Sequence, residues 1–325
     1  MNRTRRTGLG LLSTTVLLTT LLSACASDAD QPGDFAGGQD AATAKTSVTL
    51  IEQPWDDLQV ENEITKQLLT KLGYTVKVDA VSVELGAQAI STGGADAYLG
   101  NWWPSQQPTY GDLIDAEKVE VVNEELVTGT EYAPAVPGDV ASKLSVDSLA
   151  DLDQHGAEFD HKIYGIEAGS PGNETIQKAI DDDAYGLGDW KLVESGTAAM
   201  LAQVEKNEKE GKPIVFLAWS PHWMTVQYKT VFLDDPEQVW GGAGVIRSVT
   251  RAGLATDQPA VAKLLANQKF TTDQAGQFYY DKDKSGKSVP EIATAWIAAN
   301  PDTVKTFLAG VTATDGKPAE QVLFP

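Results

Sequence analysis

The order of the predicted elements indicates an α/β protein made of two lobes. Short apolar strands alternate with amphipathic helices along most of the chain, and this alternation is typical of parallel sheets flanked by helices. The alternation occurs in two series, which join near residue 130. The segment Ile214–Trp219 is apolar at every position, as expected for a strand that helices cover on both faces. Each lobe is therefore expected to hold a mostly parallel sheet.

The first series begins after Lys45 with a strand over Ser47–Ile51. We expect a helix over Asp57–Leu72, because its apolar residues recur on one face and Gly73 follows at a typical position for a helix end. Further along, the pattern predicts a strand at Val76–Val81, a helix from Val83 and a short strand at Ala97–Leu99.

The second series lies after residue 160. Its expected elements are a strand at Ile163–Ile166, a helix at Asn173–Ile180, a strand at Leu192–Val193, a helix at Thr197–Lys209 and a strand at Pro213–Trp219. A strand-like segment at Gly244–Val249 rejoins the two lobes, and helices at Pro259–Lys269 and Pro290–Leu308 form the tail. This order predicts one lobe from residues 46–129 and 246–325 and a second lobe from residues 130–245.

Charge and composition exclude several classes of function. The 325 residues carry 25 Lys and Arg against 46 Asp and Glu, a net charge of −21, which opposes binding to nucleic acid. The single cysteine and three scattered histidines (His155, His161, His222) predict no disulfide, metal site or cofactor. The segment Asp281–Gly286 begins like a calcium loop, but Ile292 stands where the last acidic ligand should be. We interpret this segment as a solvated turn.

The N-terminal residues have the pattern of a bacterial lipoprotein signal. Three arginines precede the apolar run Gly8–Leu22, which is too short to span a bilayer. The run ends in Leu22-Ser23-Ala24-Cys25, which resembles a lipobox with Cys25 as the lipidated residue. We expect residues 1–24 to be a signal peptide and residues 25–45, which are small and polar, to be a flexible tether. The protein is then anchored to the membrane outside the cytoplasm.

Tryptophan lies at or just after the carboxyl ends of three predicted strands, at Trp55, Trp102 and Trp219. Ligands of open α/β sheets bind beyond the carboxyl ends of strands, so these rings are expected to meet at one cleft. Indole faces attract a diffuse positive charge, at about 0.5–2 kcal/mol each. This combination favours a quaternary ammonium ligand, whose methyl groups also gain from burial. The neighbours Trp103 and Trp223 can pack outside the cleft, and we expect Trp190, Trp240 and Trp296 in the core.

Other polar residues near these strand ends have two interpretations each. Asp57 can accept a hydrogen bond from a ligand hydroxyl or attract a cation, or it can be the N-cap of the following helix. The turn Gly169–Asn173 opens a helix, so its backbone amides can meet a polar ligand end or form a plain strand-to-helix turn. His222 is interpreted as an orienting or structural histidine.

Two other functions remain open at this point. The tryptophan faces could stack sugar rings, or buried carboxylates could serve an extracytoplasmic hydrolase. The hydrolase requires two close acids in the cleft, and the pattern places only Asp57 there. The chain has no G-x-S-x-G, H-E-x-x-H, Walker or Rossmann motif, so we do not expect an enzyme.

Five stretches carry a resemblance to a known family over nearly all of residues 46–325. The chain resembles the substrate-binding proteins of bacterial ABC importers for glycine betaine, proline betaine and choline, and most of all the choline-binding type. The stretches are PWDD (54–57), YLGNWWP (98–104), KIYGIEAGSPGN (162–173), GKPIVFLAWSPHWM (211–224) and NPDTVKTFLAGV (300–311).

The resemblance implies a type II periplasmic-binding-protein fold, in which two hinge crossings join two lobes that close on the ligand. It also implies an ABC permease as partner and a monomer. By match to the family, the ligand-binding residues are expected to be the cage residues Trp55, Trp102, Tyr132 and Trp219, with Asp57 for the choline hydroxyl, Asn173 as a polar contact and His222 as a further candidate.

Two features of the sequence depart from the family pattern, and two other residues bear on the choice of ligand. Trp103 and Trp223 occupy positions that vary in the family, and Gly169-Ser170-Pro171 can alter the contacts to the polar end of the ligand. An ionised Asp57 repels a carboxylate, which favours choline, whereas His222 could serve glycine betaine. Choline is therefore the expected ligand, with glycine betaine as a close second.

Overall fold

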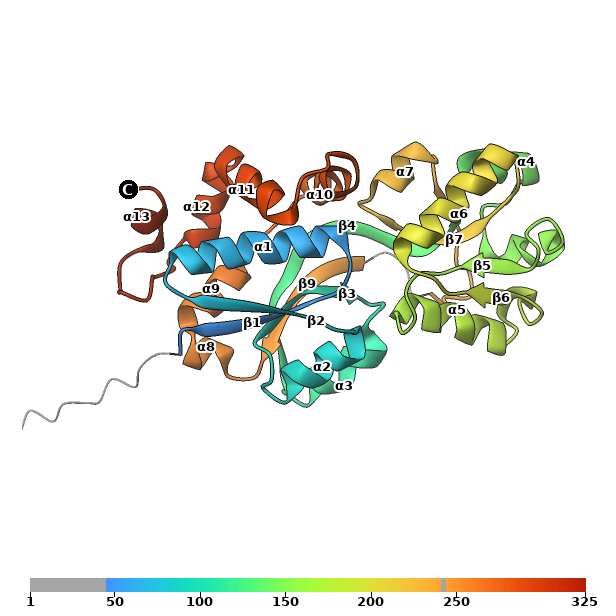
Figure 1. Ribbon diagram of the computed structural model, residues 1–325. Helices are drawn as coiled ribbons and strands as arrows, with labels where there is room; N and C mark the ends of the chain where they lie inside the picture. Colours follow the sequence, from blue (N-terminus) through green and yellow to red (C-terminus); the bar gives the residue numbers. More distant parts are fainter. Residues whose placement is uncertain (1–44, 241–243) are drawn as a thin grey trace, which may run out of the picture. The chain divides into compact units, whose positions relative to one another are not determined.

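The computed structural model describes residues 45–240 and 244–325 (Figure 1). The predicted signal peptide, Cys25 and most of the predicted tether lie outside the described residues. The strands follow the order β2-β1-β3-β9-β4-β7-β5-β6, and β8 pairs with β4. Their bounds are β1 Ser47–Glu52, β2 Thr75–Ala80, β3 Ala97–Trp103, β4 Val119–Val136, β5 Lys162–Tyr164, β6 Lys191–Val193, β7 Val215–Ser220, β8 Val231–Phe232 and β9 Gly244–Arg251.

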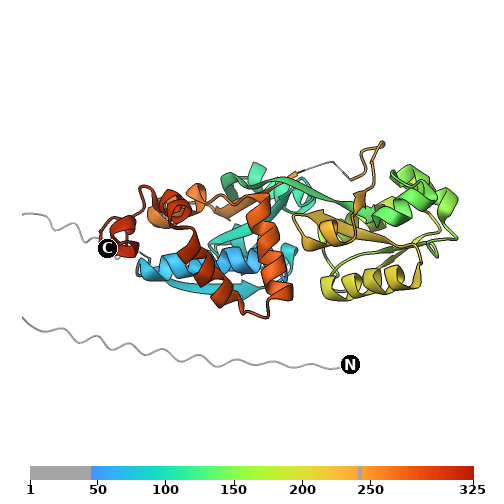
Figure 2. The same ribbon diagram turned by 90° about the horizontal axis from the view of Figure 1, so that it is seen from above.

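The long strand β4 belongs to two groups of strands, and Figure 2 shows it running from one to the other. Its residues up to Thr130 pair with β9, and its residues from Glu131 to Ala135 pair with β7. We call β1, β2, β3, β9 and the start of β4 the first strand group. The second strand group comprises β5, β6, β7, β8 and the end of β4.

Parallel and antiparallel pairing are divided in the same way. β1 pairs in parallel with β2 and β3, and β5 pairs in parallel with β6 and β7. The antiparallel pairs all involve β4 or β9, the two strands beside the junction. The predicted α/β class is confirmed, with parallel strands in both groups.

Helices cover both faces of each strand group (Figure 1). α1 lies on one side of β1–β3 with α2 and α3 on the other, while α6 and α5 lie on opposite sides of β5–β7. α1 buries Val60, Ile64, Leu68 and Leu69 completely, as its helical spacing predicts. The bounds are α1 Asp56–Lys71, α2 Val83–Ser91, α3 Gln107–Asp115, α4 Gly138–Leu144, α5 Pro171–Asp181, α6 Thr197–Glu210, α7 Trp223–Gln227, α8 Leu254–Asp257, α9 Pro259–Asn267, α10 Thr272–Lys284, α11 Val289–Ala299, α12 Pro301–Leu308 and α13 Ala319–Leu323.

Several predicted boundaries were wrong. β3 continues to Trp103, so Trp102 lies within the strand and does not follow it, and β7 ends one residue later than predicted, at Ser220. The expected tail helix Pro290–Leu308 is two helices, because the chain breaks at Asn300 before Pro301. α10 was not predicted, and most of the expected turn at 281–286 is its last helical turn.

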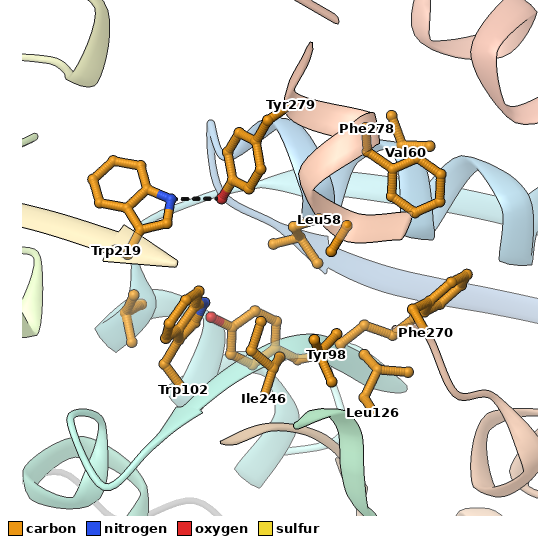
Figure 3. Close-up of a cluster of buried hydrophobic side chains, with 14 of the residues drawn as sticks. Leu58, Val60, Tyr98, Trp102, Leu126, Trp219, Ile246, Phe270, Phe278 and Tyr279 are labelled. Carbon is orange, nitrogen blue, oxygen red and sulfur yellow. Dashed lines mark hydrogen bonds between the residues drawn. The ribbon is translucent and has the colours of Figure 1, made fainter. Parts of the chain in front are cut away.

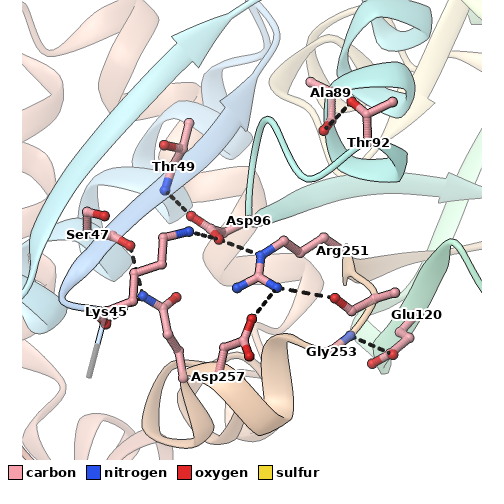
Figure 4. A network of polar contacts seen from close by, with 12 residues as sticks. Lys45, Ser47, Thr49, Ala89, Thr92, Asp96, Glu120, Arg251, Gly253 and Asp257 are labelled. Atoms are coloured by element: carbon pink, nitrogen blue, oxygen red, sulfur yellow. Dashed lines mark hydrogen bonds and ion pairs between the residues drawn. The ribbon is translucent and has the colours of Figure 1, made fainter. Parts of the chain in front are cut away.

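An ionic network around the buried Asp96 fixes the start of the described chain to the first strand group (Figure 4). Asp96 accepts hydrogen bonds from Lys45 Nζ at 2.9 Å and from Arg251 Nε at 2.8 Å. It also accepts one from the backbone amide of Thr49 at 2.9 Å. The guanidinium of Arg251 reaches Asp257 at 2.8 Å. The network thereby joins β1 to the end of β9.

No helix in the described part of the chain is long and apolar enough to cross a membrane.

Candidate ligand-binding cavity

An aromatic cavity lies between the two strand groups. Its volume is about 20 Å³, so the side chains that line it lie close together. Five aromatic side chains line it, and the remaining lining residues are small, apolar or uncharged. The lining residues are Trp55, Trp102, Tyr132, Trp219 and Tyr279, with Ser105, Gln106, Ile166 and Pro171.

The strand pairing brings three of these rings together. Tyr132 of β4 lies directly opposite Trp219 of β7, and their ring centroids are 6.4 Å apart. Trp102 of β3 lies on the other side of Tyr132, with centroids 5.6 Å apart. Trp55 arrives from the end of β1, as the residue before α1. The four residues predicted as a cage therefore line one cavity.

The core of the first strand group continues into this cavity (Figure 3). Leu58 and Phe278 are buried core residues, and the next residue along α10, Tyr279, turns its ring toward Trp219. The packed core fixes α10, so the position of the Tyr279 ring is fixed with it.

A hydrogen-bond chain leads from the cavity to a buried carboxylate. The indole Nε1 of Trp219 donates to the hydroxyl of Tyr279 at 3.0 Å, and that hydroxyl donates to Asp57 Oδ1 at 2.7 Å. Asp57 is 1% exposed and is not among the lining residues. It is also not the helix N-cap, because α1 begins at Asp56, and its Oδ1 accepts from the backbone amide of Leu58 at 2.8 Å.

Asp57 shares its buried site with a second acid, Glu61, one turn later on α1. Burial raises the pKa of Asp57 to about 6, although the hydrogen bond from Tyr279 opposes the shift. Burial and the nearby Asp57 raise the pKa of Glu61 well above its usual range. Two adjacent buried carboxyls do not both ionise easily, so the charge on one raises the pKa of the other.

A residue that follows a strand of the second strand group orients the indole of Trp55. Its indole Nε1 donates to Glu167 Oε1 at 2.5 Å, and Glu167 follows β5. The second carboxylate oxygen of Glu167 accepts a hydrogen bond from the hydroxyl of Thr197 at 3.3 Å. The indole of Trp55 is thus oriented by a half-buried carboxylate.

The structure places Asn173 and His222 behind the cavity wall. The amide of Asn173 donates to the carbonyls of Ile166 and Glu167 at 3.0 and 3.1 Å, and its Oδ1 accepts from the Ile166 amide at 3.0 Å. His222 packs on Tyr279 with centroids 4.4 Å apart, and its Nδ1 accepts from the Met224 amide at 3.0 Å. Burial lowers the pKa of His222 to about 3, so the ring is neutral.

The other five tryptophans do not line the cavity. Trp190 is buried in the core, and Trp296 packs among Phe270, Phe278 and Phe307. Trp240 was expected in the core, but it packs against Tyr132 with centroids 5.4 Å apart and donates its indole N–H to the Tyr132 carbonyl. Trp103 and Trp223 do not line the cavity, and each is covered by a cation, Arg247 at 3.8 Å and Lys284 at 4.1 Å.

Sequence reasoning missed Glu167 and Tyr279. Glu167 lies within a quoted family stretch and just beyond the end of a predicted strand, so the strand-end argument could have included it. Tyr279 lies in the middle of an unpredicted helix, and no local pattern distinguishes it from Tyr280. Among the described residues, no group of three or more His, Cys, Asp or Glu could hold a metal ion.

Two groups of strands joined by β4, with an aromatic cavity between them, define a two-lobe binding protein of the type II periplasmic class. A family model described as the substrate binding domain of ABC-type glycine betaine transport systems matches residues 46–299. The chain belongs to this family. Its relatives are binding proteins of transport systems, and the chain is not an enzyme.

Among curated proteins, the chain is similar to the glycine betaine/carnitine transport binding protein GbuC of Listeria monocytogenes. The two are 35% identical over 161 residues, which is 50% of this chain and about half (53%) of the Listeria protein. The glycine betaine/proline betaine-binding periplasmic protein of Escherichia coli is 27% identical over 277 residues, covering 76% of this chain and 80% of that protein.

Solved structures give a similar result. An ABC-transporter choline binding protein in complex with choline is 31% identical, with a TM-score of 0.82 over 86% of this chain and 97% of that chain. Lactococcal OpuAC, in its closed conformation complexed with glycine betaine, is 27% identical, with a TM-score of 0.72 over 81% of this chain and 99% of that chain.

Proposed function

We propose that this protein captures a quaternary ammonium compound in its aromatic cavity and delivers it to an ABC permease. One observation carries the proposal: five aromatic rings line the cavity, and none of the described lining residues is charged. Such a wall attracts a cation whose methyl groups cannot donate hydrogen bonds. Each ring contributes about 0.5–2 kcal/mol to the binding free energy, and burial of the methyl groups adds to this. The sum is sufficient for micromolar affinity, which corresponds to about −8 kcal/mol.

The charges behind the wall favour choline over glycine betaine. Asp57 and Glu167 place negative charge beside Tyr279 and Trp55, which adds to the attraction for a cation. The carboxylate of glycine betaine would be repelled by these charges, and no cationic side chain in the lining would compensate. His222 does not supply one, because burial keeps it neutral. Glycine betaine is the second candidate.

The proposed ligand contacts are direct for some residues and indirect for others. Trp55, Trp102, Tyr132 and Trp219 form the cage. Asp57 acts through Tyr279, whose hydroxyl lies between it and the cavity. Asn173 acts by fixing the segment that leads to Glu167. A sugar site is disfavoured, because few polar groups line the cavity and the Gln106 amide is bonded to Tyr98 and Gly100.

We further propose that residues 46–129 with 246–325, and residues 130–245, are two lobes that close on the ligand. The change of partner along β4 at Thr130 supports this division. We also propose that Cys25 anchors the protein, as a monomer, outside the cytoplasm. The lipobox supports the anchor, and three relatives are named periplasmic.

Calorimetry on the full chain tests the ligand class with choline, glycine betaine, carnitine and 3,3-dimethylbutanol, the neutral carbon analogue of choline. We expect micromolar binding of choline, weaker binding of glycine betaine, and at least about tenfold weaker binding of the neutral analogue. If none of the three quaternary ammonium compounds binds at millimolar concentration, the proposal fails. Equal binding of choline and its neutral analogue would remove the cation from the argument.

A further inference from the structure

Two of the cavity tryptophans donate their indole N–H across the junction between the strand groups, in opposite directions. Trp55, which follows β1 in the first strand group, donates to Glu167 of the second. Trp219, in β7 of the second strand group, donates to Tyr279 on α10, which packs against α1. Each residue therefore lines the cavity while its indole nitrogen donates to the opposite strand group or to a helix packed on that group.

We propose, resting on the function proposed above, that Trp55 and Trp219 also act as a clasp between the lobes, and that Glu167 and Tyr279 are positioning residues that hold the clasp closed. The cage then exists only while the lobes are together, because separating them removes the acceptor from each indole. Closure thereby completes the cage, and loss of an acceptor chiefly speeds ligand release.

The acceptors are suited to this role. Glu167 is a carboxylate, and its bond from the Trp55 indole is charge-assisted and short at 2.5 Å. Its other oxygen is tied to Thr197 within the second strand group. Tyr279 accepts from Trp219 while donating to Asp57, so its hydroxyl proton is already committed and its lone pair faces the indole. Both acceptors are therefore oriented before closure.

The test is a double-mutant cycle measured by stopped-flow release of choline from the full chain. Trp55→Phe keeps an aromatic face but removes the N–H, and Glu167→Ala removes the acceptor. We expect Glu167→Ala to speed release about tenfold in the wild-type background and to change little in the Trp55→Phe background. Glu167→Gln keeps an acceptor oxygen, so its release rate should stay within about threefold of wild type.

A second arm uses Tyr279→Phe, which should also speed release about tenfold. Its matched control is Tyr280→Phe, the next residue on α10, which is 52% exposed and should release choline at the wild-type rate. The same Trp55 and Glu167 cycle is measured on the midpoint of urea unfolding in ligand-free protein. A bond between the lobes makes the two substitutions non-additive there also.

The outcomes separate the clasp from the proposed function. If wild type binds choline but the two substitutions are additive in both release and unfolding, the clasp is wrong and the function stands. Glu167→Gln could weaken choline binding as much as Glu167→Ala, by slowing association at low salt but not at high salt. Glu167 would then act by attracting the cation with its charge, and the clasp would be overturned. If wild type binds no ligand, the function fails, and the unfolding cycle alone decides the clasp.

Discussion

The chemistry of the cavity depends on how closely single residues approach one another. Tyr132 reaches the cavity wall over Gly172, the second residue of α5, and a Cβ at Gly172 would lie 2.0 Å from the Tyr132 hydroxyl. Ser170 and the backbone of Gly172 hydrogen-bond to that hydroxyl. A glycine is required there by contact with a neighbouring ring, and backbone conformation is not the reason.

We expect Gly172→Ala to push the Tyr132 ring out of place and weaken choline binding about tenfold, because one cage face is lost. Calorimetry measures the effect. The matched control is Gly196→Ala at the start of α6, where an added Cβ meets nothing within 4 Å. Equal affinity of Gly172→Ala and wild type would show that Tyr132 is not a cage residue.

The pKa of Asp57 determines the pH dependence that we expect for choline binding. Its raised pKa, about 6, means that its charge is present above that pH and is lost as the pH falls through it. Choline binding is expected to weaken by up to about tenfold between pH 7.5 and 5, because the negative charge behind Tyr279 disappears. Titrations over this pH range measure the change.

The matched variant is Asp57→Asn, whose amide oxygen can still accept from Tyr279. It should bind choline weakly at all pH values, without the pH dependence, and should bind glycine betaine as well as wild type or better. The opposite order of effects on the two ligands would reverse the choice of choline.

At the scale of elements, the ends of the strands position the residues of the cavity. β1 and β5 end just before Trp55 and Glu167, while β3 and β7 carry Trp102 and Trp219 at or near their last residues. These ends meet where β4 changes partner, so the junction collects the rings. The far end of the first strand group is instead closed by the network around Asp96.

Asp96→Asn should reduce the free energy of unfolding by roughly 3 kcal/mol, because it leaves the mostly buried Arg251 with only the half-exposed Asp257 as a charged partner. Urea unfolding measures the loss. Although burial opposes it, hydrogen bonding to Arg251 and Lys45 lowers the pKa of Asp96, so its stabilisation is present above the ordinary aspartate range and lost as pH falls below it.

The control for this variant is Asp302→Asn, a surface acid 95% exposed in its side chain and paired with Lys305. Its unfolding free energy should change by less than about 0.5 kcal/mol. Equal effects of the two substitutions would contradict the importance of the buried network.

At the scale of the whole molecule, capture and location are separate properties. The proposed anchor, Cys25, lies outside the described residues, whereas the cavity residues all lie between residues 55 and 279. Cys25→Ala is therefore expected to move the protein from the membrane fraction to the soluble fraction and to leave the affinity for choline unchanged. Fractionation followed by calorimetry checks both parts, and retention in the membrane fraction would contradict the lipid anchor.

Much of this protein could be predicted from local sequence, for a physical reason. Apolar runs and helical spacing report on burial within one element, so the α/β class and most strands and helices were predictable. The tryptophans at Trp55, Trp102 and Trp219 could be assigned to one edge because strand ends in such sheets meet there. The family resemblance added Tyr132, which no strand-end argument indicated.

The tertiary structure alone decided the hydrogen bonds that orient those rings. Asp57 could be placed near the cavity from sequence, but only the packing of α10 against α1 puts Tyr279 between it and the ligand space. The bond from Trp55 to Glu167 joins residues 112 positions apart, and its geometry depends on how the two strand groups meet. Local patterns specify which residues face inward, whereas contacts between distant segments exist only once the chain has folded.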